Sequence, residues 1–295
     1  MEELMHTRLI PALLVCLTIA TSCGQKGPAQ RKIDYTLPEG TVKVISYNIR
    51  QSGLAENDGP NAWDKRKDAT LNMIEAEAPS LFGLQEALPD QLAYISAAFP
   101  QYDRIGVGRD DGKEEGECMA IYYCKEAFEL IDGGTFWLSE TPGEVSMGWD
   151  AACHRTVTWV NLREAASGKT FFYLNTHLDH QGEKAREESV KLLSRLVDEL
   201  VPEGIPVALG GDLNSGIDSP IFDPFREINL LSARELAPGT SNAGTFNAWG
   251  SAPSGIVLDH IFIRDAKALE FSTLNGDYGA PFISDHYPIE LTFEL

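Results

Sequence analysis

The sequence has little positive charge, and this shortage weighs against one class of function. Only 24 Lys and Arg residues stand against 44 Asp and Glu residues, which gives a formal net charge of -20. A field of this sign repels polyanions, whereas proteins that grip duplex phosphates usually carry a basic stripe. We therefore expect no extended nucleic-acid footprint, although the charge leaves room for a local basic pocket.

Cysteine is also scarce, and its spacing is not that of a metal site. Of the five cysteines, Cys16 and Cys23 fall in the N-terminal segment and Cys118, Cys124 and Cys153 in the rest of the chain. An odd number without a CxxC motif argues against a disulfide framework and against a zinc site. Two of the last three cysteines could still form one disulfide, and the sequence does not show which two.

Long apolar runs are absent except near the start. Arg8 precedes the apolar run 9–20, which is too short for a membrane-spanning helix and is typical of a signal peptide. The residues ATSCG at 20–24 resemble a bacterial lipobox, whose cysteine becomes lipidated. We therefore expect residues 1–22 to be a lipoprotein signal peptide and the exported protein to be held on the membrane by lipid on Cys23, in the periplasm or at the cell surface. An ordinary secretory signal is the alternative.

The remaining chain alternates between strand-like and helix-like segments and shows no internal repeat. Residues 23–40, rich in Gly, Pro and Lys, are expected to form a tether, and residues 41–295 one catalytic domain. Apolar alternation and β-branched runs predict strands at 42–48, 81–86, 119–123, 128–131, 156–162, 170–176, 206–209, 255–263 and 288–293. Helical periodicity predicts helices at 64–78, 88–99 and 183–201. Both halves contain strands and helices, which suggests two packed sheets flanked by helices.

Polar residues stand at the ends of these strands. Any one of them is as consistent with a helix cap or a turn as with a functional site. The ordered set is much harder to explain in that way. Its members are Asn48, Glu86, His177, Asp212, Asn214, Asp259, Asp285 and His286.

Six motifs around these residues resemble the endonuclease/exonuclease/phosphatase superfamily. They are YNIR at 47–50, LQE at 84–86, NTHL at 175–178, GDLN at 211–214, LDHIF at 258–262 and SDHYP at 284–288. The resemblance covers nearly all of 42–295 and implies a four-layer α/β sandwich of the deoxyribonuclease I type, with two packed mixed sheets flanked by helices. It also implies cleavage of a phosphate ester with Mg²⁺, or alternatively Mn²⁺, but it does not specify the substrate.

The residue types suit such chemistry. Mg²⁺ prefers one or two carboxylates and keeps several waters, so Glu86 is the first expected ligand, with Asn48 and Asp285 in support. Asp212 would orient or deprotonate the attacking water. We expect Asn214, two residues on, to face the same side of an extended segment and to fix that geometry.

The two histidines are expected to act on the phosphate. His286 would lie near the phosphate while Asp259 holds its other ring nitrogen, an arrangement that favours an imidazolium. His177 would donate to a non-bridging oxygen or assist the leaving group. A serine nucleophile is a weak alternative because no GxSxG elbow is present.

Two further residues are candidates for substrate contact. The guanidinium of Arg155 can fork onto two phosphate oxygens, but a salt-bridged arginine is an equally good interpretation. Trp249, in the loop-like stretch 247–250, is expected at the rim of the site.

Together these features predict a monomeric phosphoesterase that acts on a small or lipid-borne phosphate mono- or diester. A secreted metal-dependent nuclease is the first alternative. A lipoprotein that only binds a ligand is the second, and the presence of Glu86, Asp212 and His286 disfavours it.

Overall fold

The computed structural model describes residues 27–33, 35–241 and 243–295. The predicted signal peptide and the predicted lipidation site, Cys23, lie outside the described residues. The later part of the predicted tether contacts the domain, because the Arg31 N–H donates to the Ala98 carbonyl and Ile33 is buried in the core. Within the described part of the chain, no helix has the length and apolar character needed to cross a membrane.

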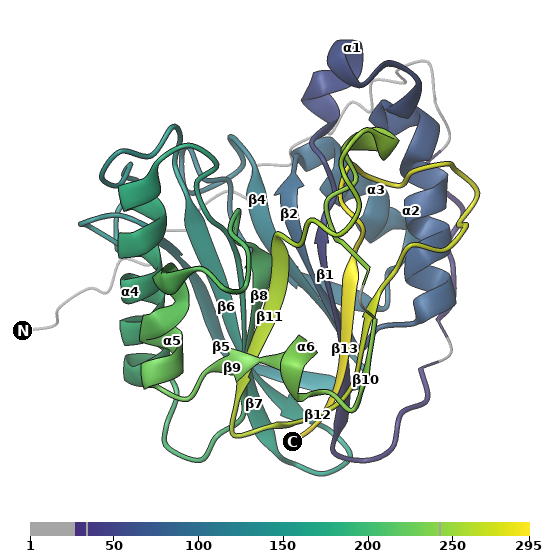
Figure 1. Cartoon of the computed structure of the whole chain (residues 1–295). Helices are drawn as coiled ribbons and strands as arrows, with labels where there is room; N and C mark the ends of the chain where they lie inside the picture. Colours follow the sequence, from purple (N-terminus) through teal and green to yellow (C-terminus); the bar gives the residue numbers. More distant parts are fainter. Residues whose placement is uncertain (1–26, 34, 242) are drawn as a thin grey trace, which may run out of the picture.

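The domain has four layers, as Figure 1 shows: helices α2 and α3, two sheets in the middle, and helices α4 and α5. This confirms the predicted α/β sandwich. The helices are α1 (Ala55–Asp58), α2 (Trp63–Glu77), α3 (Pro89–Ala98), α4 (Glu183–Leu200), α5 (Asp223–Glu227) and α6 (Ala233–Leu236).

Both sheets are mixed. The seven-stranded sheet has the order β10 (Gly239–Thr240), β12 (Lys267–Thr273), β13 (Ile289–Glu294), β1 (Thr41–Asn48), β2 (Leu81–Ala87), β4 (Cys118–Cys124) and β3 (Tyr102–Ile105). The six-stranded sheet has the order β5 (Phe128–Trp137), β6 (Thr156–Glu164), β7 (Thr170–His177), β8 (Val207–Asp212), β11 (Asp259–Arg264) and β9 (Leu231–Ser232).

Each sheet contains a central parallel pair joined by a helix. Strands β1 and β2 pair in parallel with α2 between them in the chain, and β7 and β8 pair in parallel with α4 between them. A parallel pair needs such a crossover, and its carboxyl ends lie at one edge of the sheet. The two pairs therefore deliver Asn48, Glu86, His177 and Asp212 to the same end of the molecule.

Most expected elements are present, and the differences have local causes. Strand β5 continues to Trp137 through Gly133 and Gly134, which interrupt the apolar pattern but keep the pairing with β6. The segment expected as a strand from residue 255 becomes one only at Asp259. The short, polar strand β3 and strand β12 at the opposite side of the sheet were not expected.

The sheets are joined by polar groups close to this end of the strands. Asn175 on β7 donates from Nδ2 to the carbonyls of Leu84 (2.8 Å) and Ala120 (3.0 Å), and its Oδ1 accepts from Gln85 Nε2 at 2.6 Å. Gly83 permits this approach, since a Cβ there would lie 2.6 Å from the Tyr173 hydroxyl. These bonds fix how one sheet lies on the other.

Glu290, the second residue of β13, is a buried carboxyl with 8% of its surface exposed. Its Oε2 lies 3.3 Å from Lys43 Nζ. Burial raises the pKa of Glu290 to about 7; Lys43 opposes this shift and Glu77 adds to it. The carboxyl therefore binds its proton more tightly in the folded chain than in the unfolded one.

We expect Glu290→Gln to stabilise the protein above neutral pH. The stability that this carboxyl contributes is complete below its unfolded pKa of about 4.5 and is lost as the pH rises through 7. The amide cannot ionise, so the variant should gain on the order of 2 kcal/mol at pH 8 and almost nothing at pH 4. Urea unfolding of both proteins at the two pH values measures this, and a variant that is less stable at pH 8 would contradict it.

Candidate active site

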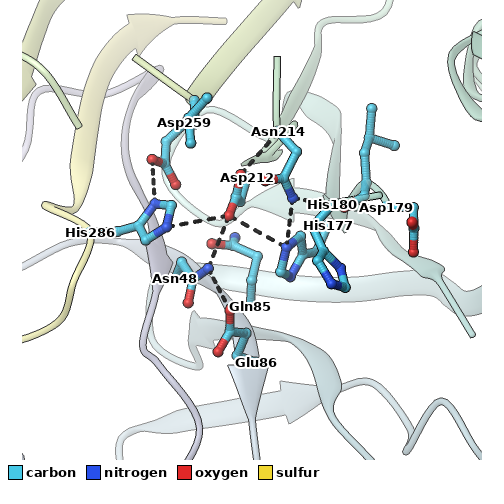
Figure 2. A network of polar contacts seen from close by, with 12 residues as sticks. Asn48, Gln85, Glu86, His177, Asp179, His180, Asp212, Asn214, Asp259 and His286 are labelled. Atoms are coloured by element: carbon cyan, nitrogen blue, oxygen red, sulfur yellow. Dashed lines mark hydrogen bonds and ion pairs between the residues drawn. The ribbon is translucent and has the colours of Figure 1, made fainter. Parts of the chain in front are cut away.

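A cavity of about 460 Å³ opens where the two sheets end. Its wall includes most of the residues predicted from the strand ends, and Figure 2 shows how they converge. Asn48 and Asp259 are buried and contact residues of the wall. The predicted residues that line it are Glu86, Arg155, His177, Asp212, Asn214, Asp285 and His286.

Glu86 stands on a β-bulge near the end of β2. The pairing with β4 shifts between Leu84 and Ala87, and Glu86 has a φ of 61°, a left-handed conformation that is uncommon for a non-glycine residue. Its Oε1 accepts from Asn48 Nδ2 at 3.0 Å and its Oε2 from the Gln51 N–H at 3.2 Å. Backbone strain of this kind is typical of functional sites.

Asp285 is the second carboxylate at this part of the cavity. Its Oδ2 lies 3.5 Å from Arg50 Nη1. Burial raises the pKa of Asp285; His286 and Arg50 lower it, and the charge of Glu86 raises it further. Two carboxylates that repel each other beside a cavity suit Mg²⁺, which takes one or two carboxylates and completes its shell with water.

Asn48 connects Glu86 to Asp212. Its Nδ2 donates to Glu86 Oε1 and to Asp212 Oδ2, both at 3.0 Å, while its Oδ1 accepts the Arg50 N–H at 3.0 Å. In this orientation the amide acts as a donor between two carboxylates. The expectation that Asn48 gives an oxygen to the metal stays a prediction.

Asp212 is held by hydrogen bonds to both of its oxygens. Besides the Asn48 bond, the Asn214 N–H donates to Oδ1 at 3.0 Å. Burial raises the pKa of Asp212, His286 lowers it and Asp259 raises it. Asn214 is close to Asp212 as predicted, but for a different reason. It does not continue an extended segment, because its φ is 48° and the strand ends at Asp212.

His286 lies between two carboxylates. Its Nδ1 is 2.8 Å from Asp259 Oδ2, and its Nε2 is 3.6 Å from Asp212 Oδ2. Burial alone would lower the pKa of His286, but Asp259 and Asp212 raise it above its usual value. The ring is therefore an imidazolium at neutral pH, and Phe246 packs edge-on against it with ring centroids 5.0 Å apart.

The same three residues could be taken for a metal site. Ligand atoms of Asp212, Asp259 and His286 all lie within 4.8 Å of one another. Histidine binds a metal through a deprotonated nitrogen, whereas here both ring nitrogens of His286 face carboxylates, which raise the pKa of the ring. Glu86 and Asp285, which also line the cavity, stay the predicted cation ligands.

His177 ends β7 and lies on the other side of Asp212. Asn214 Nδ2 lies 3.1 Å from His177 Nε2, and Asp212 Oδ2 lies 3.4 Å from the same nitrogen. Burial, followed by the charges of Arg155 and His286, lowers the pKa of His177 well below its usual value. The ring is thus neutral. The Asn214 amide is the donor to Nε2, and Nδ1 is buried without a hydrogen-bond partner in the described part of the chain.

Arg155 fits both interpretations of its position in the sequence, a salt-bridged arginine and a phosphate-binding one. Its Nε donates to the buried Asp179 at 3.2 Å, and its Nη2 lies 2.9 Å from His180 Nδ1. Its Nη1 has no hydrogen-bond partner among the residues that the structure describes, and the side chain lines the cavity. The arginine is therefore both ion-paired and available to an anion.

Asp179, which holds Arg155, also lies near Cys153 and His180 in a metal-like arrangement. Its carboxylate is already saturated with donors. Besides Arg155 and the Cys153 thiol, it accepts the backbone N–H groups of Ala152, Gln181 and Gly182. This group positions the arginine. The three cysteines in the described part of the chain are free thiols.

The structure does not bring Trp249 into the cavity. Its ring packs against Phe282, with centroids 6.5 Å apart, and under the Arg66 guanidinium at 5.6 Å. Its backbone N–H donates to Asn247 Oδ1, and the residue does not line the cavity. The aromatic residue in the wall is Phe246 instead.

The polar wall residues that the sequence analysis did not single out include Gln51, Arg109 and Glu117. Gln51 follows the first motif directly. Arg109 and Glu117 lie within the glycine- and acid-rich segment GRDDGKEEGE at 108–117, between two strands. Glycines at both ends of a charged segment indicate a tight hairpin, which would have brought the arginine and the glutamate together.

A model of the Endonuclease/Exonuclease/phosphatase family matches residues 45–286, which spans every site described above. The chain belongs to this family. Its members are hydrolases that act on phosphoesters, typically with a divalent metal. Both the predicted family and the predicted fold are thereby confirmed.

Relatives of similar length support this family assignment. The structure of a family member from Bacteroides vulgatus is 34% identical, with a TM-score of 0.81, and the match covers 86% of this chain and 99% of that one. A mannosyl-6-phosphatase from Bacteroides thetaiotaomicron is 32% identical, also with a TM-score of 0.81, over 86% of this chain and all of the other. The mimivirus protein L388 is 24% identical over 273 residues, which is 86% of this chain and 100% of L388.

Proposed function

We propose that this family member is a metal-dependent phosphomonoesterase acting on a small, sugar-like phosphate ester. The carrying observation is the cavity itself, in which two carboxylates suited to Mg²⁺ lie beside Asp212 and a buried arginine with a free nitrogen. A cavity of about 460 Å³ suits a small ligand. The 32% identity to a mannosyl-6-phosphatase supports a phosphorylated sugar.

In this proposal, the chain's own groups place the attacking water and the phosphate. Asp212 accepts a proton from the water, since Asn48 and the Asn214 N–H fix the direction of its lone pairs. His286, kept protonated by Asp259, donates from Nε2 to a phosphoryl oxygen as negative charge develops there. Arg155 Nη1 binds a second oxygen.

Glu86 and Asp285 would hold the cation. A bound Mg²⁺ supplies neutralisation of the phosphoryl oxygens and polarises the ester. On the other side of the site, the neutral His177 accepts the Asn214 amide through Nε2, while its Nδ1 is buried without a hydrogen-bond partner in the described part of the chain. In this proposal His177 positions Asn214 and Asp212 and carries no positive charge.

The proposal is tested by the choice of ester. We expect the tether-free protein to release phosphate from hexose 6-phosphates and from phenyl phosphate when Mg²⁺ is present. Bis(4-nitrophenyl) phosphate should react at least about 100-fold more slowly in kcat/KM, because its second aryl group replaces the oxygen that Arg155 would bind. A diester that reacts faster than both monoesters would assign the site to diester cleavage.

We further propose that the enzyme is exported and anchored by lipid on Cys23, on the lipobox-like sequence that precedes the domain. The variant Cys23→Ala should move the full chain from the membrane fraction to the soluble fraction. Cys153→Ala, which leaves the same segment intact, is the matched control and should stay on the membrane. If Cys23→Ala also stays there, a different segment or partner holds the protein.

A further inference from the structure

Part of the wall of the cavity comes from a short hairpin that contributes Arg109 and Glu117. Residues 106–117 connect β3 to β4, and the Arg109 N–H donates to the Glu117 carbonyl at 3.0 Å while Gly108 bridges to Cys118. Asp111 Oδ1 accepts two backbone N–H groups, from Lys113 and Glu115. The hairpin is thus stabilised by its own hydrogen bonds.

Neighbouring elements fix the hairpin further. Trp137 Nε1 donates to the Arg109 carbonyl at 2.8 Å, and His154 Nδ1 lies 2.8 Å from Asp110 Oδ1. Gly116 has a φ of 81°, and a Cβ there would lie 2.2 Å from Asp110 Oδ2, so only glycine closes the turn. Such support keeps the side chains of the hairpin in one place.

Three side chains of this wall bind one another. Glu117 Oε2 lies 2.5 Å from Arg109 Nη1, and Glu117 Oε1 accepts from Gln51 Nε2 at 2.9 Å. Glu117 is only 5% exposed, yet it lines the cavity. Within the described ranges of the chain, Arg109 Nη1 donates to Glu117 and Nη2 makes no hydrogen bond, whereas Nε is buried away from the cavity. The trio therefore keeps both acceptor and donor capacity toward the cavity.

This combination suits hydroxyl groups better than a second phosphate. Arg109 and Glu117 neutralise each other, and the carboxylate would repel an anion. A hydroxyl group donates one hydrogen bond and accepts others, so it can use a carboxylate lone pair and a guanidinium N–H together. Two neighbouring hydroxyls on a carbon chain would satisfy both groups at once.

The trio is also linked by hydrogen bonds to the groups that would hold the water and the metal. A chain of contacts runs from Asp212 through Asn48 to Glu86, and from Glu86 through Gln51 to Glu117. Gln51 contacts Glu86 with its backbone and Glu117 with its side chain. In an in-line attack the leaving oxygen departs away from the water that Asp212 holds, and Gln51 and Glu117 are the members of this chain of contacts farthest from Asp212.

We propose that Gln51, Arg109 and Glu117 form a subsite that binds the hydroxyl groups of the leaving alcohol. The inference rests on the proposed phosphomonoesterase function and assigns the recognition of its leaving alcohol, a polyol such as a sugar, to named residues. The three residues act on substrate selection, and the water and phosphate are held by other groups.

The test compares an ester with hydroxyls to one without. We would measure kcat/KM for a hexose 6-phosphate and for phenyl phosphate in the wild type, in Glu117→Gln and in Glu115→Gln. We expect the preference for the hexose ester to fall by about 50-fold in Glu117→Gln, because the amide presents a donor where Arg109, Gln51 and the hydroxyl need an acceptor. Glu115 is exposed on the same hairpin, and its variant should keep the wild-type preference.

Other results would overturn the inference in distinct ways. An unchanged preference in Glu117→Gln would show that the trio does not bind the hexose. An increase in the Mg²⁺ concentration needed for half-maximal rate, with the preference kept, would make Glu117 a metal ligand beside Glu86. Hydrolysis of phenyl phosphate without any preference for the hexose ester in the wild type would remove the subsite and leave the phosphomonoesterase intact. Hydrolysis of neither would remove the proposed function itself.

A second variant covers the case in which Glu117→Gln does not fold. Gln51→Ala removes one hydrogen bond of the trio and leaves the buried ion pair of Arg109 and Glu117 in place. We expect it to reduce the preference for the hexose ester by about 5- to 10-fold, mainly through KM. An unchanged preference in this folded variant would count against the subsite.

Discussion

Asp212→Asn is expected to lower kcat by about 10³-fold or more, because an amide cannot take a proton from the attacking water. The change keeps the volume of the side chain, and its remaining oxygen can still accept the Asn48 or the Asn214 hydrogen bond. Burial already raises the pKa of this carboxyl, so loss of its charge should not destabilise the fold. Phosphate release under saturating substrate, beside a thermal unfolding curve, measures both effects.

The matched control for this variant is Asp218→Asn, a few residues along the same loop and exposed to solvent. It should keep the wild-type kcat and the wild-type unfolding temperature. If Asp212→Asn turned over substrate within 10-fold of the wild type, Asp212 would not be the base, and His177 would be the next residue to test.

Glu86→Gln is expected to raise the Mg²⁺ concentration needed for half-maximal activity by roughly 100-fold, since it removes one of two carboxylates that suit the ion. In the wild type, a chelator should lower the rate by about 10²- to 10³-fold, and excess Mg²⁺ or Mn²⁺ should restore it. A metal titration of the rate, together with direct binding of Mn²⁺ to the enzyme without substrate, separates metal loss from loss of chemistry.

Glu115→Gln should need the same Mg²⁺ concentration as the wild type in this experiment, because the Glu115 side chain is exposed and does not line the cavity. Full activity of the wild type in chelator would remove the metal from the proposal. Equal Mg²⁺ requirements for Glu86→Gln and the wild type would instead move the ion to other ligands, with Asp285 as the remaining candidate.

The part of the site that could be predicted from sequence is the part carried by the central strands. A buried strand has a clear apolar pattern, and the first polar residue after it must lie at the edge of the sheet. Asn48, His177 and Asp212 follow this rule in the structure. Because the strands of a parallel pair end at the same edge of the sheet, the pattern also predicts that residues far apart in the chain lie close together.

The rest of the site depends on bulges, turns and loops, whose backbone conformation leaves no periodic pattern in the sequence. Glu86 and Asn214 lie where they do because of a bulge and a left-handed residue, neither of which an alternating pattern reveals. Arg109 and Glu117 are adjacent only because a hairpin folds back on itself. Trp249 is the opposite case, a residue predicted at the site that the structure places elsewhere. Its ring packs against Phe282 and not in the cavity.

The amide of Asn175, which joins the two sheets, has a consequence for recombination between relatives. Glu86 and Asp285 belong to the seven-stranded side of the molecule, whereas Asp212 and His177 belong to the six-stranded side. The alignment of these groups is thus a property of the interface and of neither half alone. A hybrid that joins one half of this chain to the other half of a relative would inherit every catalytic residue, yet it would work only where both parents share this amide and the glycine opposite it.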